Sequence, residues 1–184
     1  MRGEVRIIGG EFRGRKLKIP EILHLRPTPD RVRETLFNWI APVLPGAHCL
    51  DAFTGSGVLG FEAISRGAAH VVMVDESLTV VKLIQEELEL FNIKNAEIYQ
   101  ASLPRQLKKP EKLFDIVFLD PPFQTDLLKS MSIYLEENGF LSPHALIYLE
   151  AKTMLTEKDI PANWEIIRSK KAGQVAYHLA RRLV

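Results

Sequence analysis

The sequence contains a single cysteine, Cys49, among its 184 residues. One cysteine cannot form an internal disulfide, a cysteine-ligated zinc site or an iron–sulfur cluster. The five histidines show no metal-ligand spacing, so we expect no bound metal. Cys49 itself lies in an apolar run before a glycine turn, where a small core residue is more typical than a nucleophile.

Long apolar runs are also absent, so we expect no membrane-spanning helix. Residues 1–6 lack the apolar core of a signal peptide, and the expected location is therefore the cytoplasm. The sequence has neither G-x-x-x-x-G-K nor G-x-S-x-G. Nucleotide hydrolysis by a P-loop and serine hydrolysis therefore have no support.

The net charge of +1 is unevenly distributed. Residues 1–33 carry nine Lys and Arg against four acids, and residues 165–184 carry five against one. The centre of the chain is acidic. Two basic ends favour contact with a polyanion, although a solvated surface is the simpler alternative.

Strand and helix patterns alternate along most of the chain. Short strands are expected at 5–8 and 16–19 around a basic glycine loop, and Thr28 is expected to cap a helix that begins with Pro29. Further strands are expected at 48–51, 71–75, 96–100, 114–119 and 145–149, with two more over 164–183, and helices at 58–65, 77–91 and 125–137.

This pattern predicts an α/β fold with a doubly wound, mostly parallel, seven-stranded sheet of Rossmann-like topology. The last two strands have no helix between them, so we expect an antiparallel C-terminal hairpin. Residues 1–44 are expected to form a small hairpin-and-helix extension, and residues 45–184 the main domain.

A glycine turn follows the strand expected at 48–51. Residues 55–60 have G-x-G-x-x-G spacing, and Asp75 ends the next strand, as in dinucleotide-binding folds. Asp51, however, stands at the strand tip, where it would repel a pyrophosphate at the following helix N-terminus. It would attract the ammonium and sulfonium of S-adenosylmethionine. We therefore favour this methyl donor, with Asp75 accepting ribose hydroxyls.

The motif Asp120-Pro121-Pro122-Phe123 follows the strand expected at 114–119. Open α/β sheets bind ligands at this edge. The prolines remove two N–H donors and leave the Asp120 carboxylate and the Pro121 carbonyl as two acceptors. Two acceptors fit a planar –NH₂ group, and Phe123 can stack on the ring that carries it. The motif therefore favours chemistry at an exocyclic amine.

Both motifs resemble those of class I methyltransferases that act on exocyclic amines, whose catalytic signature is D/N-P-P-F/Y/W. Other blocks resemble, more narrowly, the bacterial RsmD-type 16S ribosomal RNA guanine-N2 methyltransferases. These blocks are residues 6–10, 13–17, 26–28, 30–38 and 173–177. The resemblance extends from about residue 5 to about residue 182.

The resemblance implies methylation of a guanine N2 in 16S rRNA, within an assembled or partly assembled 30S subunit. We expect the protein to be a monomer. The resemblance also implies that the amine is held by residues 120–123, and that S-adenosylmethionine is bound by Asp51, Phe53, Thr54, Gly55, Gly57, Asp75 and Ser102. The family usually has Asp or Asn at the position of Ser102. With an RNA substrate, phosphate contacts are expected from Arg13, Arg15, Lys16, Arg26, Arg31 and Arg33.

Several alternatives remain open. Arg31 and Arg33 could instead pair with Asp30 and Glu34. Adenine-N6 methylation of DNA or RNA, or methylation of a protein glutamine amide, would use the same pair of acceptors. No segment resembles a separate target-recognition domain, which disfavours DNA. A non-enzymatic RNA-binding module is a third class, but the intact Asp51 and D-P-P-F motif argue against it.

Overall fold

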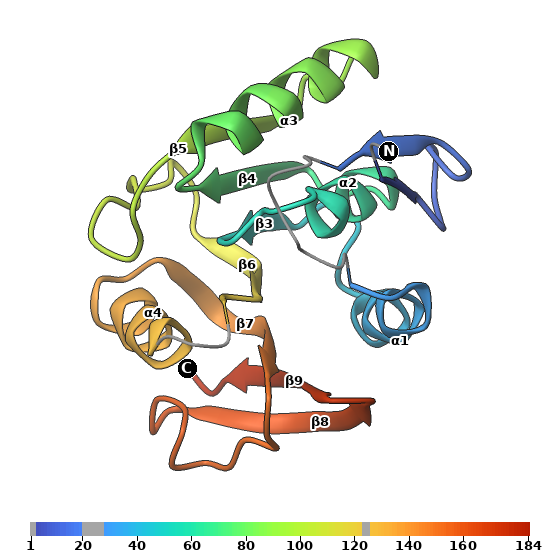
Figure 1. Ribbon diagram of the computed structural model, residues 1–184. Helices are drawn as coiled ribbons and strands as arrows, with labels where there is room; N and C mark the ends of the chain where they lie inside the picture. The colour runs from blue at the N-terminus through green and yellow to red at the C-terminus, as the bar shows by residue number, and fades with distance from the viewer. Residues whose placement is uncertain (1–2, 20–27, 123–125) are drawn as a thin grey trace.

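The computed structural model describes residues 3–19, 28–122 and 126–184 (Figure 1). Its strands are β1 Glu4–Arg6, β2 Lys16–Lys18, β3 His48–Asp51, β4 His70–Asp75, β5 Ala96–Gln100, β6 Phe114–Leu119, β7 Leu141–Ala151, β8 Trp164–Ala172 and β9 Val175–Arg182. Its helices are α1 Asp30–Ile40, α2 Val58–Ser65, α3 Leu78–Leu90 and α4 Leu127–Glu137. None of the helices in these described ranges is long and apolar enough to cross a membrane.

Seven strands form one sheet in the order β5-β4-β3-β6-β7-β9-β8. The first five are parallel, and β9 runs antiparallel to both β7 and β8. The predicted fold class is confirmed. Strand order reverses between β3 and β6, so the ends of these strands open at the topological switch point where such sheets bind ligands. We call the edge at which the parallel strands end the carboxyl edge.

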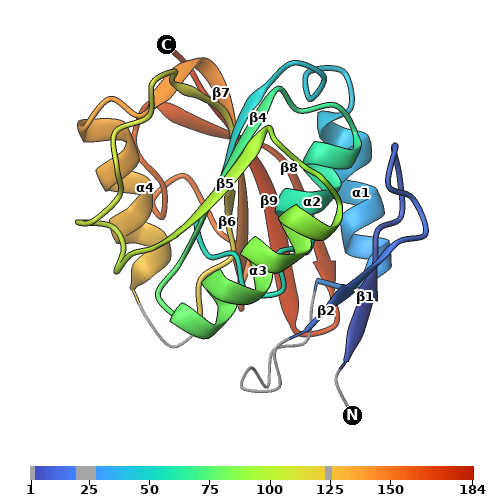
Figure 2. The ribbon, with the colours of Figure 1, turned by 90° about the horizontal axis from the view of Figure 1, so that it is seen from above.

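Side chains of the parallel strands alternate between two apolar layers. Cys49, Met73 and Phe118 share one cluster with α1, α2 and α3, whereas Leu50 and Val117 share the other with α4. Figure 2 shows α1, α2 and α3 on one side of the sheet and α4 on the other. Burial on both faces explains why these strands are almost continuously apolar in sequence.

The N-terminal segment packs against the layer formed by α2 and α3. Strands β1 and β2 form a separate antiparallel pair. Helix α1 places Phe37 against Phe118 with ring centroids 5.9 Å apart, and Trp39 stacks on Tyr177 at 5.5 Å. The division of the chain at residue 45 stays a prediction, and the two segments share one apolar core.

Most element boundaries differ from the predictions by one or two residues, and two differences have a clear structural cause. Pro29, not Thr28, occupies the N-cap position of α1, and the Thr28 hydroxyl lies 3.5 Å from Glu150 Oε1, to which it donates. A residue before proline is pushed toward extended geometry, which suits this position outside the helix. Strand β7 begins at Leu141, earlier than predicted, because a bulge opposite β6 accommodates the residues around His144.

Candidate active site

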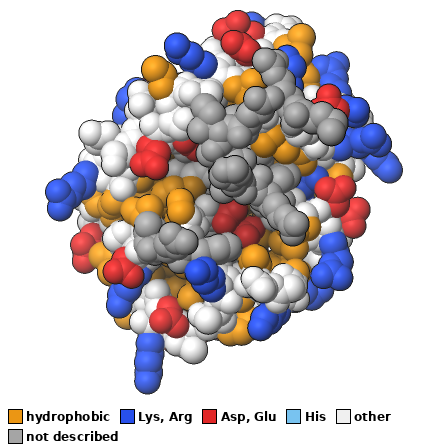
Figure 3. Space-filling view, viewed as in Figure 1, with side chains coloured by type: hydrophobic (Ala, Val, Ile, Leu, Met, Phe, Trp, Pro, Cys, Tyr) orange, Lys and Arg blue, Asp and Glu red, His pale blue; other side chains and the backbone are white. Residues whose placement is uncertain are grey.

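Four carboxyl groups lie along the carboxyl edge of four neighbouring strands. Asp75 ends β4, Asp51 ends β3, Asp120 follows β6, and Glu150 is the penultimate residue of β7. Alternate residues of a strand share a face. The residues two positions before these carboxyls are Met73, Cys49, Phe118 and Tyr148, in the same order. All four belong to the layer beneath α1, α2 and α3. Figure 3, drawn from the side seen in Figure 1, shows acidic side chains near the middle of this face.

The glycine turn brings the start of α2 against Asp51. The Asp51 side chain is only 3% exposed, and its Oδ2 accepts a hydrogen bond from the Gly60 N–H at 3.0 Å. Gly57 has a φ of +77°, and a Cβ there would lie 2.5 Å from Ile84 Cδ1. A Cβ on Gly60 would lie 2.7 Å from Met73 Sδ. The motif therefore requires glycine for backbone geometry and for close packing.

Asp75 and Thr54 hold the same turn from the β4 side. Asp75 Oδ2 accepts from the Gly55 N–H, and Oδ1 accepts from the Ser77 N–H, both at 2.9 Å. The Thr54 hydroxyl accepts from the Val74 N–H at 3.0 Å. An ionised carboxylate can accept about four hydrogen bonds, so Asp75 keeps acceptor capacity for a ligand. Its structural role in the turn was not evident from the sequence.

The remaining residues predicted to bind the cofactor flank this turn. Phe53 is half-buried and packs against the layer that contains α4. Ser102 is exposed and follows Ala101, whose N–H donates to the Asp75 carbonyl at 3.0 Å. Both lie near the carboxyl ends of β3 and β5. A side-chain contact of either one with a cofactor stays a prediction.

The D-P-P segment follows β6 directly beside β3. Asp51 is in register with Phe118, so Asp120 lies two residues beyond it. Asp120 is half-buried, Pro121 is buried and Pro122 is exposed. Phe123 lies outside the described residues. Asp51 and Asp120 therefore stand on either side of the switch point.

Burial and mutual repulsion change the titration of these carboxyls. Burial, opposed by the Gly60 hydrogen bond and reinforced by Asp75, raises the pKa of Asp51 to about 7. The pKa of Asp120 is raised well above its ordinary value by burial, then by the charges of Glu150 and Asp51. The site therefore favours a cationic ligand. Within the described part of the chain, no cluster of His, Cys, Asp and Glu could hold a metal ion.

Comparison with known proteins identifies the family. A family model described as "Conserved hypothetical protein 95" matches residues 5–181. The chain belongs to this family. It is 46% identical over 180 residues to "Ribosomal RNA small subunit methyltransferase D" of Escherichia coli (strain K12), covering 98% of this chain and 91% of the relative. A relative of the same name from Haemophilus influenzae is 45% identical over 186 residues, covering 97% and 94%.

Solved structures agree with this membership. The structure of yhhF from Escherichia coli superposes with a TM-score of 0.88 at 47% identity, covering 98% of both chains. TrmN from Thermus thermophilus has a TM-score of 0.67 at 21% identity, covering 83% of this chain and 48% of its own, and shares the fold. The Escherichia coli structure is described as "Putative methyltransferase yhhF", so this family member has the sheet of a methyltransferase fold.

Burial also bears on Cys49 in this family member. The thiol is fully buried, and burial raises its pKa above the ordinary value. A buried, protonated thiol is inert. The prediction that Cys49 is a core residue is confirmed.

The basic loop between β1 and β2 lies against the far ends of two helices. The Glu11 N–H donates to the Ser65 carbonyl at 2.7 Å, and the Arg15 guanidinium lies 4.9 Å from the Phe91 ring centroid. Because α2 and α3 return from the carboxyl edge, their C-terminal ends lie at the opposite edge of the sheet. Exposed Arg13 and Arg15 therefore lie away from Asp51.

The other residues predicted to contact RNA have different surroundings. Lys16 is half-exposed and forms an ion pair with Glu4 at 2.7 Å. Arg31 is exposed on α1. Arg26 lies outside the described residues. Contact of Lys16 or Arg31 with RNA stays a prediction.

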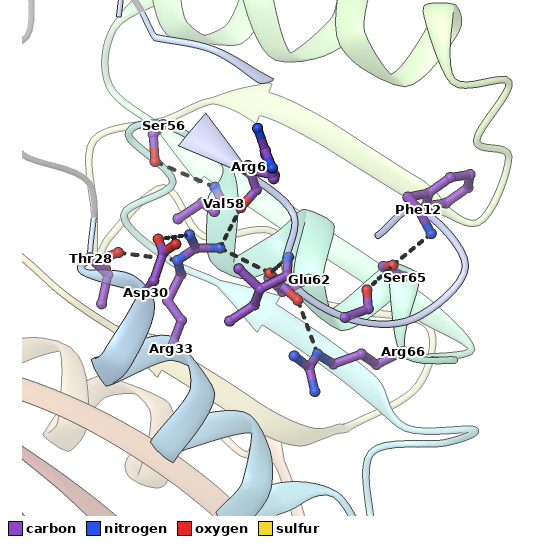
Figure 4. Close-up of polar contacts among 12 residues, drawn as sticks. Arg6, Phe12, Thr28, Asp30, Arg33, Ser56, Val58, Glu62, Ser65 and Arg66 are labelled. Carbon is purple, nitrogen blue, oxygen red and sulfur yellow. Dashed lines mark hydrogen bonds and ion pairs between the residues drawn. The ribbon is translucent and has the colours of Figure 1, made fainter. Parts of the chain in front are cut away.

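Arg33 is fully buried, which contradicts its predicted RNA contact. Figure 4 shows the polar contacts that its guanidinium makes instead. Its guanidinium forms ion pairs with Glu62 at 2.9 Å and with Asp30 at 2.5 Å. It also donates to the backbone carbonyls of Arg6 at 2.9 Å and Thr28 at 3.1 Å. The ion pair confirms the alternative that Arg33 pairs with Asp30. Its burial leaves the guanidinium no access to a phosphate.

Glu62 is a partner of Arg33 that the sequence did not reveal. It is fully buried in α2, where Oε2 accepts from Arg66 Nε at 3.0 Å and Oε1 accepts from the Ile8 N–H. A lone acid in an otherwise apolar helix was the available signal. Glu62 joins the N-terminal hairpin, α1 and α2 through one carboxylate.

Proposed function

We propose that this protein transfers a methyl group from S-adenosylmethionine to the exocyclic N2 amine of a guanine in 16S ribosomal RNA. The observation that carries the proposal is the position of Asp120 and Pro121 beside Asp51 at the switch point, which sets two amine acceptors next to a cation-attracting turn. The near full-length similarity to proteins named ribosomal RNA small subunit methyltransferase D supports this choice of substrate.

The site residues fit a cationic methyl donor. S-adenosylmethionine, when bound, supplies an electrophilic methyl group on a sulfonium. Asp51 attracts the cationic end, Gly55 and Gly57 allow close approach of the backbone, and Asp75 accepts ribose hydroxyls. The buried carboxylate of Asp51 at 3% exposure supports this assignment, because a buried charge is stabilised by an opposite one. Phe53, Thr54 and Ser102 complete the proposed cofactor site.

Asp120 and Pro121 overcome the weak nucleophilicity of an aryl amine. Its lone pair is delocalised into the ring, and two acceptors on the N–H groups favour a pyramidal nitrogen. The lone pair then forms the N–C bond while the electron pair of the C–S bond goes to sulfur. After transfer the methylated nitrogen is cationic and loses its proton to water, so the step needs no proton-abstracting base of shifted pKa. Much of the rate comes from alignment.

The target guanine must be unpaired or flipped out to reach this site, and Phe123 is proposed to stack on it. We propose that the substrate is the assembled or partly assembled 30S subunit and that the protein acts as a cytoplasmic monomer. Phosphate contacts are assigned to Arg13, Arg15, Lys16, Arg26 and Arg31. The exposure of four of these residues supports the assignment.

Single-turnover methyl transfer tests the proposal on 30S particles from a strain without this protein. Asp120→Ala should slow transfer by roughly 1000-fold with S-adenosylmethionine affinity unchanged, because it removes an acceptor used mainly in the transition state. Asp120→Asn should retain partial activity, since its amide oxygen still accepts. Digestion of the RNA should yield N2-methylguanine.

Three outcomes would contradict the proposal. A near wild-type rate for Asp120→Ala would mean that the amine is held elsewhere. Recovery of N6-methyladenine would favour the adenine alternative. Tighter binding of NADH than of S-adenosylmethionine would exclude the methyl donor.

A further inference from the structure

Glu150 extends the row of carboxyl groups on the side away from the cofactor. In the order β4-β3-β6-β7, the proposed cofactor carboxylates lie on the first two strands and the amine acceptors follow the third. Leu119 and Leu149 are in register, so Asp120 and Glu150 are neighbours on adjacent parallel strands, which are about 4.8 Å apart. Glu150 therefore lies on the side of Asp120 left for the substrate.

The Glu150 side chain is held in one orientation. It is 5% exposed, and Oε1 accepts from the Tyr148 hydroxyl at 2.7 Å and from the Thr28 hydroxyl at 3.5 Å. Tyr148 is itself fixed between the rings of Phe118 and Tyr177, with centroids 6.5 Å and 6.4 Å away. Such packing makes Glu150 a rigid acceptor.

The described residues give the Glu150 carboxyl two hydroxyl donors and no cationic partner. The ion pairs formed among the described residues do not include Glu150. Burial raises its pKa, and its charge raises that of Asp120. A buried acceptor is stabilised by further N–H donors. The substrate is one source of such donors.

Guanine differs from adenine and cytosine at the ring nitrogen next to its exocyclic amine. Its N1–H is a donor adjacent to the N2 amine. In adenine and in cytosine, the ring nitrogen beside the amine carries a lone pair and is an acceptor. A carboxylate next to the amine acceptors therefore attracts guanine and repels the other two bases.

We propose that Glu150 determines base specificity by accepting the N1–H of guanine while Asp120 and the Pro121 carbonyl accept the N2 amine. Three acceptors then meet the three donors on one edge of the base. This inference rests on the proposed function, and it assigns the choice of base to a strand outside both sequence motifs. Tyr148 and Thr28 are positioning residues, because they act through Glu150.

The test uses 16S RNA carrying 2,6-diaminopurine in place of the target guanine, assembled into small subunits. This base keeps the 2-amine but presents a lone pair at N1. Wild-type protein should methylate guanine at least about 100-fold faster, because an acceptor-lined site rejects a substrate without the matching donor. Glu150→Gln should reduce this preference to within about tenfold, since its amide can donate to N1.

Glu87→Gln is the matched control. Glu87 is also buried, at 2% exposure, but it lies in α3, where Oε1 accepts from the Lys18 N–H at 3.3 Å. This variant should keep the wild-type preference for guanine. Calorimetry should show S-adenosylmethionine affinity within twofold of wild type for both variants, which establishes that each is folded.

The outcomes separate the two levels of the proposal. If Glu150→Gln slows both substrates equally and preserves their ratio, Glu150 is only structural and the inference is overturned. If Glu150→Gln brings the methylation rate of the 2,6-diaminopurine substrate to within about tenfold of the guanine rate, the inference is supported. If wild-type protein methylates no guanine in small-subunit RNA, the proposed function falls and the inference falls with it.

Discussion

Burial of the Asp51 carboxyl favours the protein with a bound cation over the free protein. With the pKa of this carboxyl near 7, its ionised form is poorly solvated in the empty turn. The folded protein thus holds a proton that the unfolded chain releases at lower pH. The contribution of this proton to stability is lost as the pH rises from about 4 through about 7. A bound cation offsets that cost.

The affinity for S-adenosylmethionine should therefore depend on pH. Below pH 7, Asp51 must lose its proton before it attracts a cation, so affinity should rise by up to about tenfold per pH unit toward pH 7. Above about pH 8 the α-ammonium of the ligand itself deprotonates, and affinity should fall. Calorimetry between about pH 5.5 and about pH 9 measures both the rise and the fall of affinity.

Asp51→Asn provides the comparison for this prediction. This variant should lose most of its affinity for S-adenosylmethionine, and the rise of affinity toward pH 7 should disappear. The free protein should become more stable to urea at pH 8 by about 1–3 kcal/mol. If the affinity of the wild-type protein does not change between about pH 5.5 and about pH 7.5, Asp51 does not titrate on binding.

At the scale of elements, the strand–turn–helix unit of β3 and α2 depends on Gly57. Its positive φ disfavours any other residue, and the contact with Ile84 brings α3 against the turn. Gly57→Ala should destabilise the protein by about 2–4 kcal/mol and weaken cofactor binding, because α2 must move away from α3. Urea unfolding and calorimetry measure the two effects.

Gly46→Ala separates backbone strain from packing. Gly46 has a similar φ of +82°, but a Cβ there meets nothing within 4 Å. It should cost only about 1–2 kcal/mol and leave cofactor affinity unchanged. Equal losses of stability in the two variants would remove the contact with Ile84 from the explanation.

Sequence patterns predicted the elements whose causes are local. Periodicity gave the parallel strands, and the glycine spacing gave the turn at residues 55–60, because both depend on neighbours in sequence. Arg33 could not be placed in this way, since its burial depends on Glu62 and on the carbonyl of Arg6, which lie 29 and 27 residues away. Glu150 escaped notice for the same reason: only the order of strands brings it beside Asp120.

At the scale of the whole molecule, exposed basic residues from the two ends of the chain lie at opposite edges of the sheet. The loop with Arg13 and Arg15 lies at the far ends of α2 and α3. Strand β9 begins beside the end of β7, where Ala176 is in register with Ala151, so the turn between β8 and β9 lies at the carboxyl edge. Exposed Lys170 and Lys171 lead into this turn. A bound RNA that touches both must cross one side of the protein.

Charge removal at the two edges should have separable effects. The pair Lys170→Ala and Lys171→Ala should weaken binding to 30S particles, and so should the pair Arg13→Ala and Arg15→Ala. Each double variant should reduce the salt slope of log K by about one for every phosphate that it no longer neutralises. Only the pair at the carboxyl edge should also slow single-turnover transfer, because it lies beside the site.

Filter binding at several salt concentrations and calorimetry for the cofactor provide the measurements. S-adenosylmethionine affinity should stay at the wild-type value in both double variants. If either pair binds 30S particles with the wild-type salt dependence, that edge of the molecule does not contact RNA.

The buried carboxylate of Glu62 limits how this chain could be trimmed or recombined. Excising residues 3–19 would remove the Arg6 carbonyl and the Ile8 N–H, and would leave Arg33 and Glu62 short of partners. Both contacts use main-chain groups of the hairpin, so a replacement hairpin must keep the backbone path at residues 6 and 8, whatever its side chains. At the tip, a Cβ on Gly14 meets nothing within 4 Å, but its φ of +87° still favours glycine. A change of RNA preference is therefore expected from the exposed side chains of Arg13 and Arg15, with the backbone of the loop kept as it is.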